Sequence, residues 1–298
     1  VWRKENREVH KFLRAIGFSD ITKKDLEMIL DEVITRPEIM KITKDSEGNE
    51  FAELSGSFAA NAGITVRGTY QEDDSFHMDY YYPYVFGTSI TTNEQIDVEK
   101  HAEKESYAGV CDEVNLGVTL IFYIQNVADY LAETNRHLSK IHYGAMLAGL
   151  STEGKILCPV VERKKNDVPA IQKNDRHNQL IAQAREGDED AIESLTLEDM
   201  DTYALLSQRV MKEDIFSIVK STFMPFGIES DQYTVLGEII DCVTMENKLT
   251  HEKLYGMKLL CNNIQFDVCI NEKDLLGEPA IGRRFRGNVW MQGNLCLE

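Results

Sequence analysis

The chain has 298 residues, of which 43% are hydrophobic and 28% are charged. This length and composition suit two ordinary folded domains and exclude a disordered chain. Fifty acidic residues against 32 basic ones give a formal charge of −18, so the average surface repels nucleic acid and anionic lipid. The longest apolar run, residues 118–124, is far shorter than the roughly 20 residues of a membrane-spanning helix.

The cysteines and the N-terminus favour a cytoplasmic protein. The six cysteines show no spacing typical of zinc sites or of a disulfide framework, so we expect reduced core thiols, no metal and no cofactor. The first residues are charged and contain no apolar signal region. Codons for residues 3–5 can contain a ribosome-binding sequence, so we expect that translation can begin at Val9 and leave residues 1–8 out of the fold.

Two helices are expected near the start of the chain. Residues 10–16 read as a short helix that ends at Gly17. Thr22 and Asp25 form a capping-box pattern before a second helix, whose apolar residues recur at helical spacing until Pro37 ends it.

Residues 51–86 predict an antiparallel meander, with residues 71–75 as a hairpin loop. The tyrosines near its end include Tyr82 and Tyr84, which we consider as ligand-binding candidates because aromatic rings can stack on a sugar or a base. Aromatic residues at alternating strand positions are more often part of the core, and that interpretation is favoured.

The middle of the chain predicts a strand over 116–122, a helix over 125–133 and a hairpin over 145–161 that turns at residues 151–154. Charged and amide residues around Pro169 then indicate a domain boundary, and short helices are expected between residues 180 and 223. We therefore predict three parts: an α+β domain over 9–161, a linker and helical connector over 162–230, and a small β-barrel domain over 231–298.

The last part has the order of an OB-like barrel. Residues 254–261 and 264–271 read as two strands joined at Asn262 and Asn263, and Asp274 begins one expected helical turn before a final strand. Gly237 allows the first strand to bend. The predicted fold class is thus α+β, with a mixed β-rich N-terminal domain, a short helical connector and a C-terminal OB-like barrel.

Six blocks of the sequence resemble a bacterial domain-of-unknown-function family, number 3881. The blocks are HAEKESYAGVCDE, GVTLIFYIQN, AREGDEDAIESLTLEDMDTY, EDIFSIVKSTFMPFGIESDQY, FDVCINEKDLLGEP and GRRFRGNVWMQG. The resemblance covers nearly everything after Val9. It implies relatives but no activity, cofactor or site residues.

The candidates for chemistry are few. His101 and Cys111 could form a base and a thiolate nucleophile, which would make the protein a hydrolase-type enzyme. Arg284, Arg286 and Trp290 combine charge and aromatic surface as single-strand nucleic-acid binders do.

Neither alternative is supported by a complete motif, and no phosphate-binding loop or catalytic elbow is present in the sequence. We therefore predict a non-catalytic binding or assembly module. Its partner is a protein or a small molecule, since the charge argues against nucleic acid and the hydropathy against a membrane.

Overall fold

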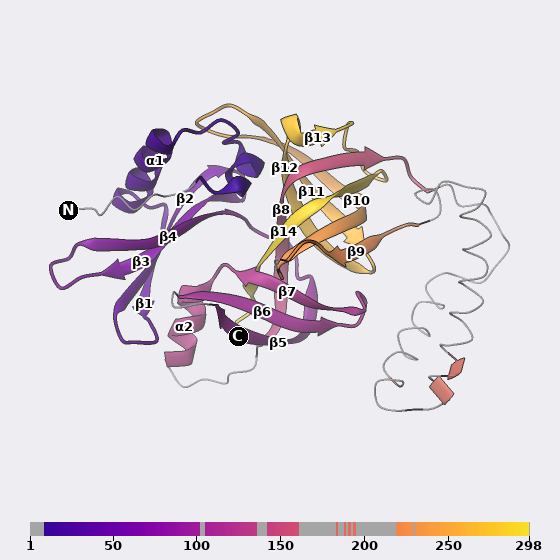
Figure 1. The fold of residues 1–298 in the computed structure, drawn as a ribbon, viewed down its shortest axis with the longest axis horizontal. Coiled ribbons are helices and arrows are strands. Elements are labelled where there is room, and N and C mark those ends of the chain that lie inside the picture. The colour runs from indigo at the N-terminus through magenta and orange to yellow at the C-terminus, as the bar shows by residue number, and fades with distance from the viewer. Residues whose placement is uncertain are drawn as a thin grey trace.

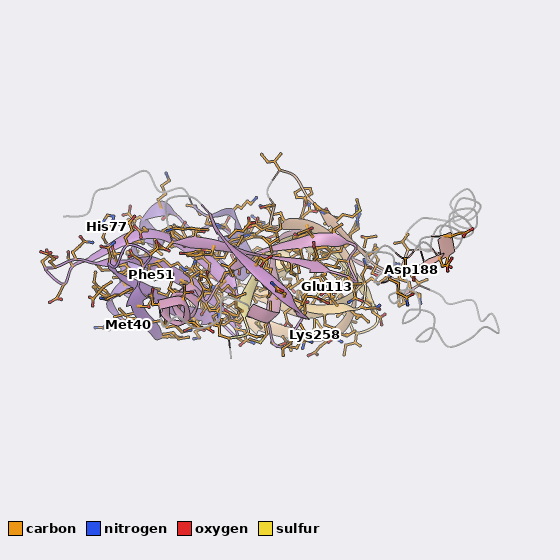
Figure 2. All side chains as sticks on the ribbon, turned by 90° about the horizontal axis from the view of Figure 1, so that it is seen from below. Met40, Phe51, His77, Glu113, Asp188 and Lys258 are labelled. Carbon is orange, nitrogen blue, oxygen red and sulfur yellow. The ribbon has the colours of Figure 1, made fainter. Side chains whose placement is uncertain are left out.

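The computed structural model describes residues 9–101, 105–135, 142–160, 219–228 and 230–297, with isolated positions between 183 and 194. Most of these residues lie in strands and few in helices, which confirms the predicted β-rich character. The strands form two sheets that occupy opposite halves of the molecule (Figure 1). Met40 and His77 of one sheet lie toward one end of the long axis, and Glu113 and Lys258 of the other lie toward the opposite end (Figure 2).

The first sheet is the predicted antiparallel meander with one added edge strand. Its strands are β1 Ile39–Lys44, β2 Glu50–Ala59, β3 Ala62–Tyr70 and β4 Phe76–Val85, in that spatial order. The hairpin between β3 and β4 turns at residues 71–75, as the sequence predicts.

One face of this sheet packs on the two predicted helices. The 3-10 helix η1, Lys11–Ile16, ends at Gly17, whose φ of 93° lies in the left-handed region that glycine adopts without strain. Helix α1, Lys23–Thr35, begins after Thr22, whose hydroxyl accepts a hydrogen bond from the Asp25 N–H. Both helices bury apolar residues in one cluster with β2, β3 and β4.

The second sheet contains ten strands. They are β5 Thr92–His101, β6 Ser106–Glu113, β7 Val118–Ile124, β8 His142–Leu157, β9 Thr222–Pro225, β10 Gln232–Glu246, β11 Lys253–Cys261, β12 Ile264–Asn271, β13 Leu275–Leu276 and β14 Arg284–Leu295. Helix α2, Val127–Asn135, follows β7, which confirms the predicted strand and helix in this region.

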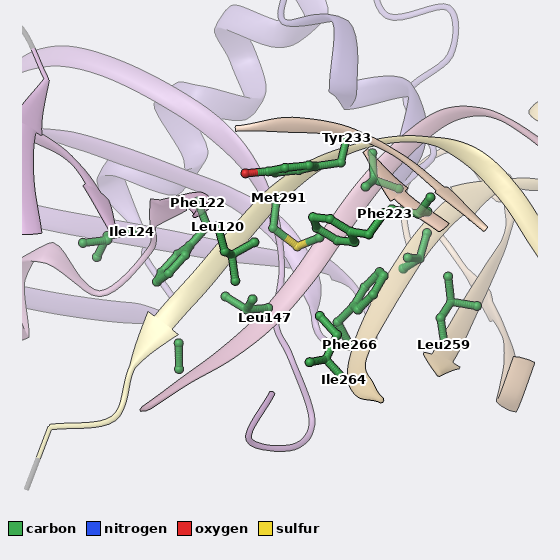
Figure 3. Packing of buried hydrophobic residues seen from close by; sticks show 14 of the residues in the cluster. Leu120, Phe122, Ile124, Leu147, Phe223, Tyr233, Leu259, Ile264, Phe266 and Met291 are labelled. Atoms are coloured by element: carbon green, nitrogen blue, oxygen red, sulfur yellow. The ribbon is translucent and has the colours of Figure 1, made fainter. Parts of the chain in front are cut away.

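Five of these strands pair in a closed cycle. β10 pairs with β11, β11 with β12, β12 with β8, β8 with β14, and β14 with β10. All of these pairs are antiparallel except β12 with β8. Apolar side chains such as Phe266 and Met291 fill the space between the strands (Figure 3).

The cycle draws β8 from the predicted 9–161 domain and the other four strands from the predicted 231–298 domain. The division of the chain at residues 161 and 231 stays a prediction. Two further predictions concern segments that lie largely outside the described residues. They are the connector helices between residues 180 and 223, and the start of translation at Val9, which would leave out residues 1–8.

The predicted hairpin over 145–161 is wrong, because β8 is one continuous strand of 16 residues. Ser151 and Glu153 pair with consecutive residues of β14, so Thr152 is the extra residue of a β-bulge and not the tip of a turn. Gly154 also has a packing role, since a Cβ there would lie 2.4 Å from the Phe285 ring. The turn-like sequence at residues 151–154 forms a bulge because β8 pairs with β12 on one side and with β14 on the other.

The turn between β12 and β14 also differs in its position. The sequence predicts one helical turn that begins at Asp274, whereas the 3-10 turn η2 spans Glu272–Asp274. It begins earlier because the Asn271 side chain accepts a hydrogen bond from the Lys273 N–H and caps the turn.

No helix in the described parts of the chain is long and apolar enough to cross a membrane. The cytoplasmic location stays a prediction.

Candidate functional site

One face of the four-stranded sheet carries polar side chains although it is buried against the large sheet. Successive side chains of a strand point to opposite faces. On β2, Glu53 and Ser55 alternate with apolar residues of the cluster that includes α1, and they pair with Arg67 and Thr65 of β3. All four polar residues are buried. Buried polar groups need hydrogen-bond partners inside the protein. The partners of this face therefore show where the two sheets meet.

Arg67 lies at the centre of this face and is fully buried. Its Nε donates to the Glu53 Oε1 at 2.7 Å, and its Nη1 donates to the hydroxyls of Tyr80 at 2.9 Å and Tyr123 at 2.7 Å. Its Nη2 donates to the Tyr82 hydroxyl at 3.1 Å. We call these five residues the junction network. It connects β2, β3 and β4 of one sheet to β7 of the other.

The network also fixes the start of helix α2. The Arg67 Nη2 donates to the backbone carbonyls of Ile124 at 3.0 Å and Gln125 at 2.8 Å, at the end of β7. The second carboxylate oxygen of Glu53 accepts from the Ala128 N–H at 2.9 Å, in the first turn of α2. A carboxylate is favourable there because the first N–H groups of a helix have no partner within the helix.

The hydroxyls of Tyr82 and Tyr123 stay protonated and can therefore donate as well as accept. Burial raises the pKa of Tyr82 and of Tyr123 above the ordinary tyrosine value, although Arg67 opposes the shift. The Tyr82 O–H donates to the Gln125 carbonyl at 3.1 Å, and the Tyr80 O–H donates to the Glu105 carbonyl at 2.7 Å. Each hydroxyl thus accepts from the guanidinium and donates elsewhere.

Two glutamine side chains join the edge of β4 to the large sheet. The Gln125 Nε2 donates to the Val85 carbonyl at 2.9 Å and to the Gln292 Oε1 at 2.8 Å, and the Gln292 Nε2 donates to the Pro83 carbonyl at 2.9 Å. The Gln125 Oε1 is different: it is buried, and no hydrogen-bond partner for it exists among the described residues. A buried acceptor without a donor is costly, so the missing donor is an exception among the polar groups of the described residues.

Gln125 lines a cavity of about 330 Å³ between the two sheets, which we call the junction cavity. Its polar lining includes Glu53, Ser55, Thr65 and Tyr82. The Ser55 and Thr65 hydroxyl oxygens lie 2.8 Å apart. This volume is at the lower end of the range of roughly 300–1,000 Å³ for ligand pockets.

Apolar side chains also line the junction cavity. Ile39, Phe86, Met146 and Leu295 contribute from both sheets. The ring of Phe86 stacks on that of Tyr84, with centroids 4.3 Å apart. A mixed lining of this kind is typical of small-molecule pockets, in which a few hydrogen-bonding groups fix the orientation of the ligand.

Charges in the junction cavity are neutralised by the protein itself. The lining contains Glu53, Lys41 and Asp129. Glu53 pairs with Arg67 at 2.6 Å, and the Lys41 Nζ pairs with the Asp129 Oδ2 at 2.6 Å, at the partly exposed side. The cavity therefore holds no ionised lining group that lacks a counter-charge among these described residues.

The backbone register separates His101 from Cys111. His101 at the end of β5 pairs with Ser106, and Cys111 lies five residues further along β6. At about 3.3 Å per residue, the two backbone positions are roughly 16 Å apart, which exceeds hydrogen-bond reach. Burial, with nearby carboxylates, also raises the pKa of Cys111 to about 12. The arrangement therefore gives no support to a thiolate–histidine pair.

Of the two tyrosine candidates, only Tyr82 lines the junction cavity. Tyr84 is buried beneath Phe86, and burial raises its pKa above the ordinary value. Neither ring is an exposed stacking platform.

The three candidates on the last strand lie apart from the junction cavity. Arg284 is buried and donates to the carbonyls of Cys158 at 2.9 Å and Val219 at 2.7 Å. Trp290 is also buried, and its Nε1 donates to the Asp231 Oδ2 at 2.7 Å. Arg286 is partly exposed and lines a separate surface hollow. The cluster therefore presents little of the basic and aromatic surface that the sequence suggests.

The residues that matter most here, Glu53, Ser55, Thr65 and Arg67, are not among the sequence candidates. A signal for them exists, because polar residues recur at every second position on two strands of a predicted meander. That period is also what a solvent-exposed face shows, so only the tertiary packing reveals that the face is buried.

The comparisons with known proteins give one match. The family model described as "Domain of unknown function, E. rectale Gene description (DUF3881)" matches residues 13–293. No curated protein and no solved structure matches the chain.

Proposed function

The chain belongs to the DUF3881 family, whose description names no activity, and we propose from the geometry that it is a non-catalytic binding module. Its ligand is a small molecule held in the junction cavity. The observation that carries this proposal is the junction cavity itself, whose lining combines the paired hydroxyls of Ser55 and Thr65 with apolar side chains from both sheets.

The absence of catalysis is supported by the state of the reactive groups near the cavity. The Arg67 guanidinium is saturated with hydrogen bonds, and Tyr82 is protonated. A general base or a nucleophile needs a pKa close to the operating pH, and burial moves these hydroxyls away from it. The groups are suited to holding a molecule in place and not to transferring a proton.

The experiment is a thermal-shift screen of small metabolites on the full chain. A ligand at 100 times its Kd stabilises the folded state by about 3 kcal/mol, which raises Tm by several degrees. We expect at least one compound to produce this shift in the native sequence and to lose it in Ile39→Trp, because Ile39 lines the cavity and the larger ring would occupy it.

The matched control is Met40→Trp. Met40 is the next residue of β1, is similarly exposed, and points to the opposite face of the strand. It should keep the response. A screen without any response, or a response that survives in Ile39→Trp, would overturn the proposal.

We also propose that the closed cycle of five strands is an OB-type barrel whose fifth strand, β8, precedes the others in the chain. A meander of β10, β11 and β12, then the turn η2 and β14, supports this proposal. OB folds bind oligonucleotides on the face of their second and third strands. Here those strands are β11 and β12, and Leu254 and Cys269 on them pack with η1. That covered face supports a small-molecule ligand over a nucleic acid.

A further inference from the structure

We infer that the junction cavity takes an uncharged, polyhydroxylated molecule of about the size of a monosaccharide or cyclitol. The inference rests on the proposed function, since it specifies the ligand class of the same cavity. It follows from three properties of the lining: its charge balance, its hydrogen-bonding groups and its apolar residues.

The charge balance excludes an ionic ligand. The ionised groups of the lining are Glu53, Lys41 and Asp129, and each already has a counter-charge at 2.6 Å. Glu53 in addition accepts from the Ala128 N–H. A carboxylate, phosphate or ammonium brought into the cavity would lose its hydration and gain no free counter-charge there, which is unfavourable.

The hydrogen-bonding groups match hydroxyls. Ser55 and Thr65 each carry a hydroxyl, which can donate and accept, and their oxygens form a pair in the lining. A ligand hydroxyl suits this pair, because it can both donate to and accept from the side-chain hydroxyls.

The apolar residues of the lining fit the carbon face of the same molecule. The Phe86 ring, which stacks on Tyr84, lines the cavity together with Ile39, Met146 and Leu295. A ring polyol has C–H groups on its faces and hydroxyls around its rim. It can therefore place C–H groups against Phe86 and hydroxyls against Ser55 and Thr65.

The test compares neutral polyols with charged molecules that share the same sugar ring. The probes are D-glucose, D-galactose and myo-inositol against D-glucuronate, D-glucosamine and D-glucose 6-phosphate, by calorimetric titration of the full chain at one ionic strength. We expect at least one neutral probe to bind, and to bind about tenfold or more tightly than its charged counterparts.

Two variants localise the binding. Thr65→Val keeps the shape of the side chain and removes one hydroxyl, so it should weaken binding of the neutral probe by about five- to tenfold. Ile39→Trp should abolish binding, and Met40→Trp should leave the affinity unchanged because its side chain lies on the other face of β1.

The outcomes separate this inference from the proposed function. If a charged probe binds more tightly than the neutral one and Ile39→Trp abolishes it, the ligand class is wrong and the cavity remains a binding site. If the metabolite screen finds only apolar or charged ligands that depend on Ile39, the ligand class is again wrong. If no compound binds in a way that depends on Ile39, both the ligand class and the proposed function are wrong.

Discussion

The two buried regions of this protein are built from similar extended strands but are held together by different interactions. Inside the cycle of β8, β10, β11, β12 and β14, the packed residues are nearly all apolar, as Phe266 and Met291 illustrate (Figure 3). Phe266, Phe285 and Ile270 are fully buried. Between the two sheets, apolar side chains such as Val85 and Leu150 share one cluster, and the fully buried Arg67 with its carboxylate and tyrosine partners adds a polar network. Apolar packing tolerates small changes in position, whereas hydrogen bonds require defined distances and angles.

This difference explains why the candidate ligand site lies at the junction. Close-packed apolar interiors leave few voids larger than a water molecule. At the junction, Arg67 of β3 holds the end of β7 by directional bonds, and a cavity of about 330 Å³ lies beside them. A rigid polar frame next to an unfilled volume is the arrangement that a small-molecule site needs.

The largest expected effect comes from removing the charge at the centre of the junction. Arg67→Met leaves Glu53 buried without its counter-charge, so the free energy of unfolding should fall by about 3–5 kcal/mol. Urea denaturation followed by circular dichroism measures this change. Arg283→Met is the matched control, because Arg283 is exposed and donates to a backbone carbonyl of Glu278; its effect should stay within about 0.5 kcal/mol.

A double variant separates the unpaired charge from lost packing. Adding Glu53→Gln to Arg67→Met removes the uncompensated carboxylate and keeps an oxygen that can accept from the Ala128 N–H. We expect the double variant to be more stable than Arg67→Met by at least about 1 kcal/mol. If the stability losses of Arg67→Met and Glu53→Gln simply add in the double variant, the unpaired carboxylate is not the cause of the loss in Arg67→Met.

The sequence predicts the local elements of both regions but not the contacts between them. The strict alternation of Ile264, Phe266, Val268 and Ile270 identifies β12, and the pair Asn262–Asn263, with φ of 45° and 67°, forms the turn before it. These signals are local, because the alternation of a strand and the conformation of a turn depend on neighbouring residues.

The junction depends on contacts that no local pattern specifies. Gln125 meets Gln292 across 167 positions of the chain, and Arg67 meets Tyr123 across 56. The predicted hairpin at residues 151–154 was wrong for the same reason, since pairing of β8 with β14 and β12 overrides the local turn preference of Ser151 and Gly154. Pairing partners far away in the sequence decide both outcomes.

A smaller effect on stability is expected from His10, which lies against Trp290 of β14. Its ring is 5.0 Å from the Trp290 ring, and its Nδ1 accepts from the Phe12 N–H. Burial, together with the nearby Lys11, lowers its pKa from 6.5 to about 4. Between these values the unfolded chain binds the proton and the folded chain does not, so stability is complete above pH 6.5 and falls as the pH decreases toward 4.

We therefore expect the free energy of unfolding to drop by about 1–2 kcal/mol between pH 7 and about pH 5 through His10 alone. His10→Asn is the matched variant, because its side-chain oxygen can still accept from the Phe12 N–H and does not titrate in this range. Urea denaturation at both pH values should show a shallower pH dependence in His10→Asn. Equal slopes would contradict the lowered pKa.

The smallest effect tests the apolar region. Ile270→Val removes one methylene from a side chain that is fully buried inside the strand cycle, and it should cost about 1 kcal/mol by urea denaturation. Ile42→Val on the exposed strand β1 makes the same chemical change and should cost less than about 0.5 kcal/mol. Because the change is apolar and lies away from the junction network, the affinity of any junction-cavity ligand should be unchanged in Ile270→Val. A loss of affinity in this variant would mean that the two regions are coupled, and the contrast between an adaptable apolar cycle and a position-sensitive polar junction would then have to be abandoned.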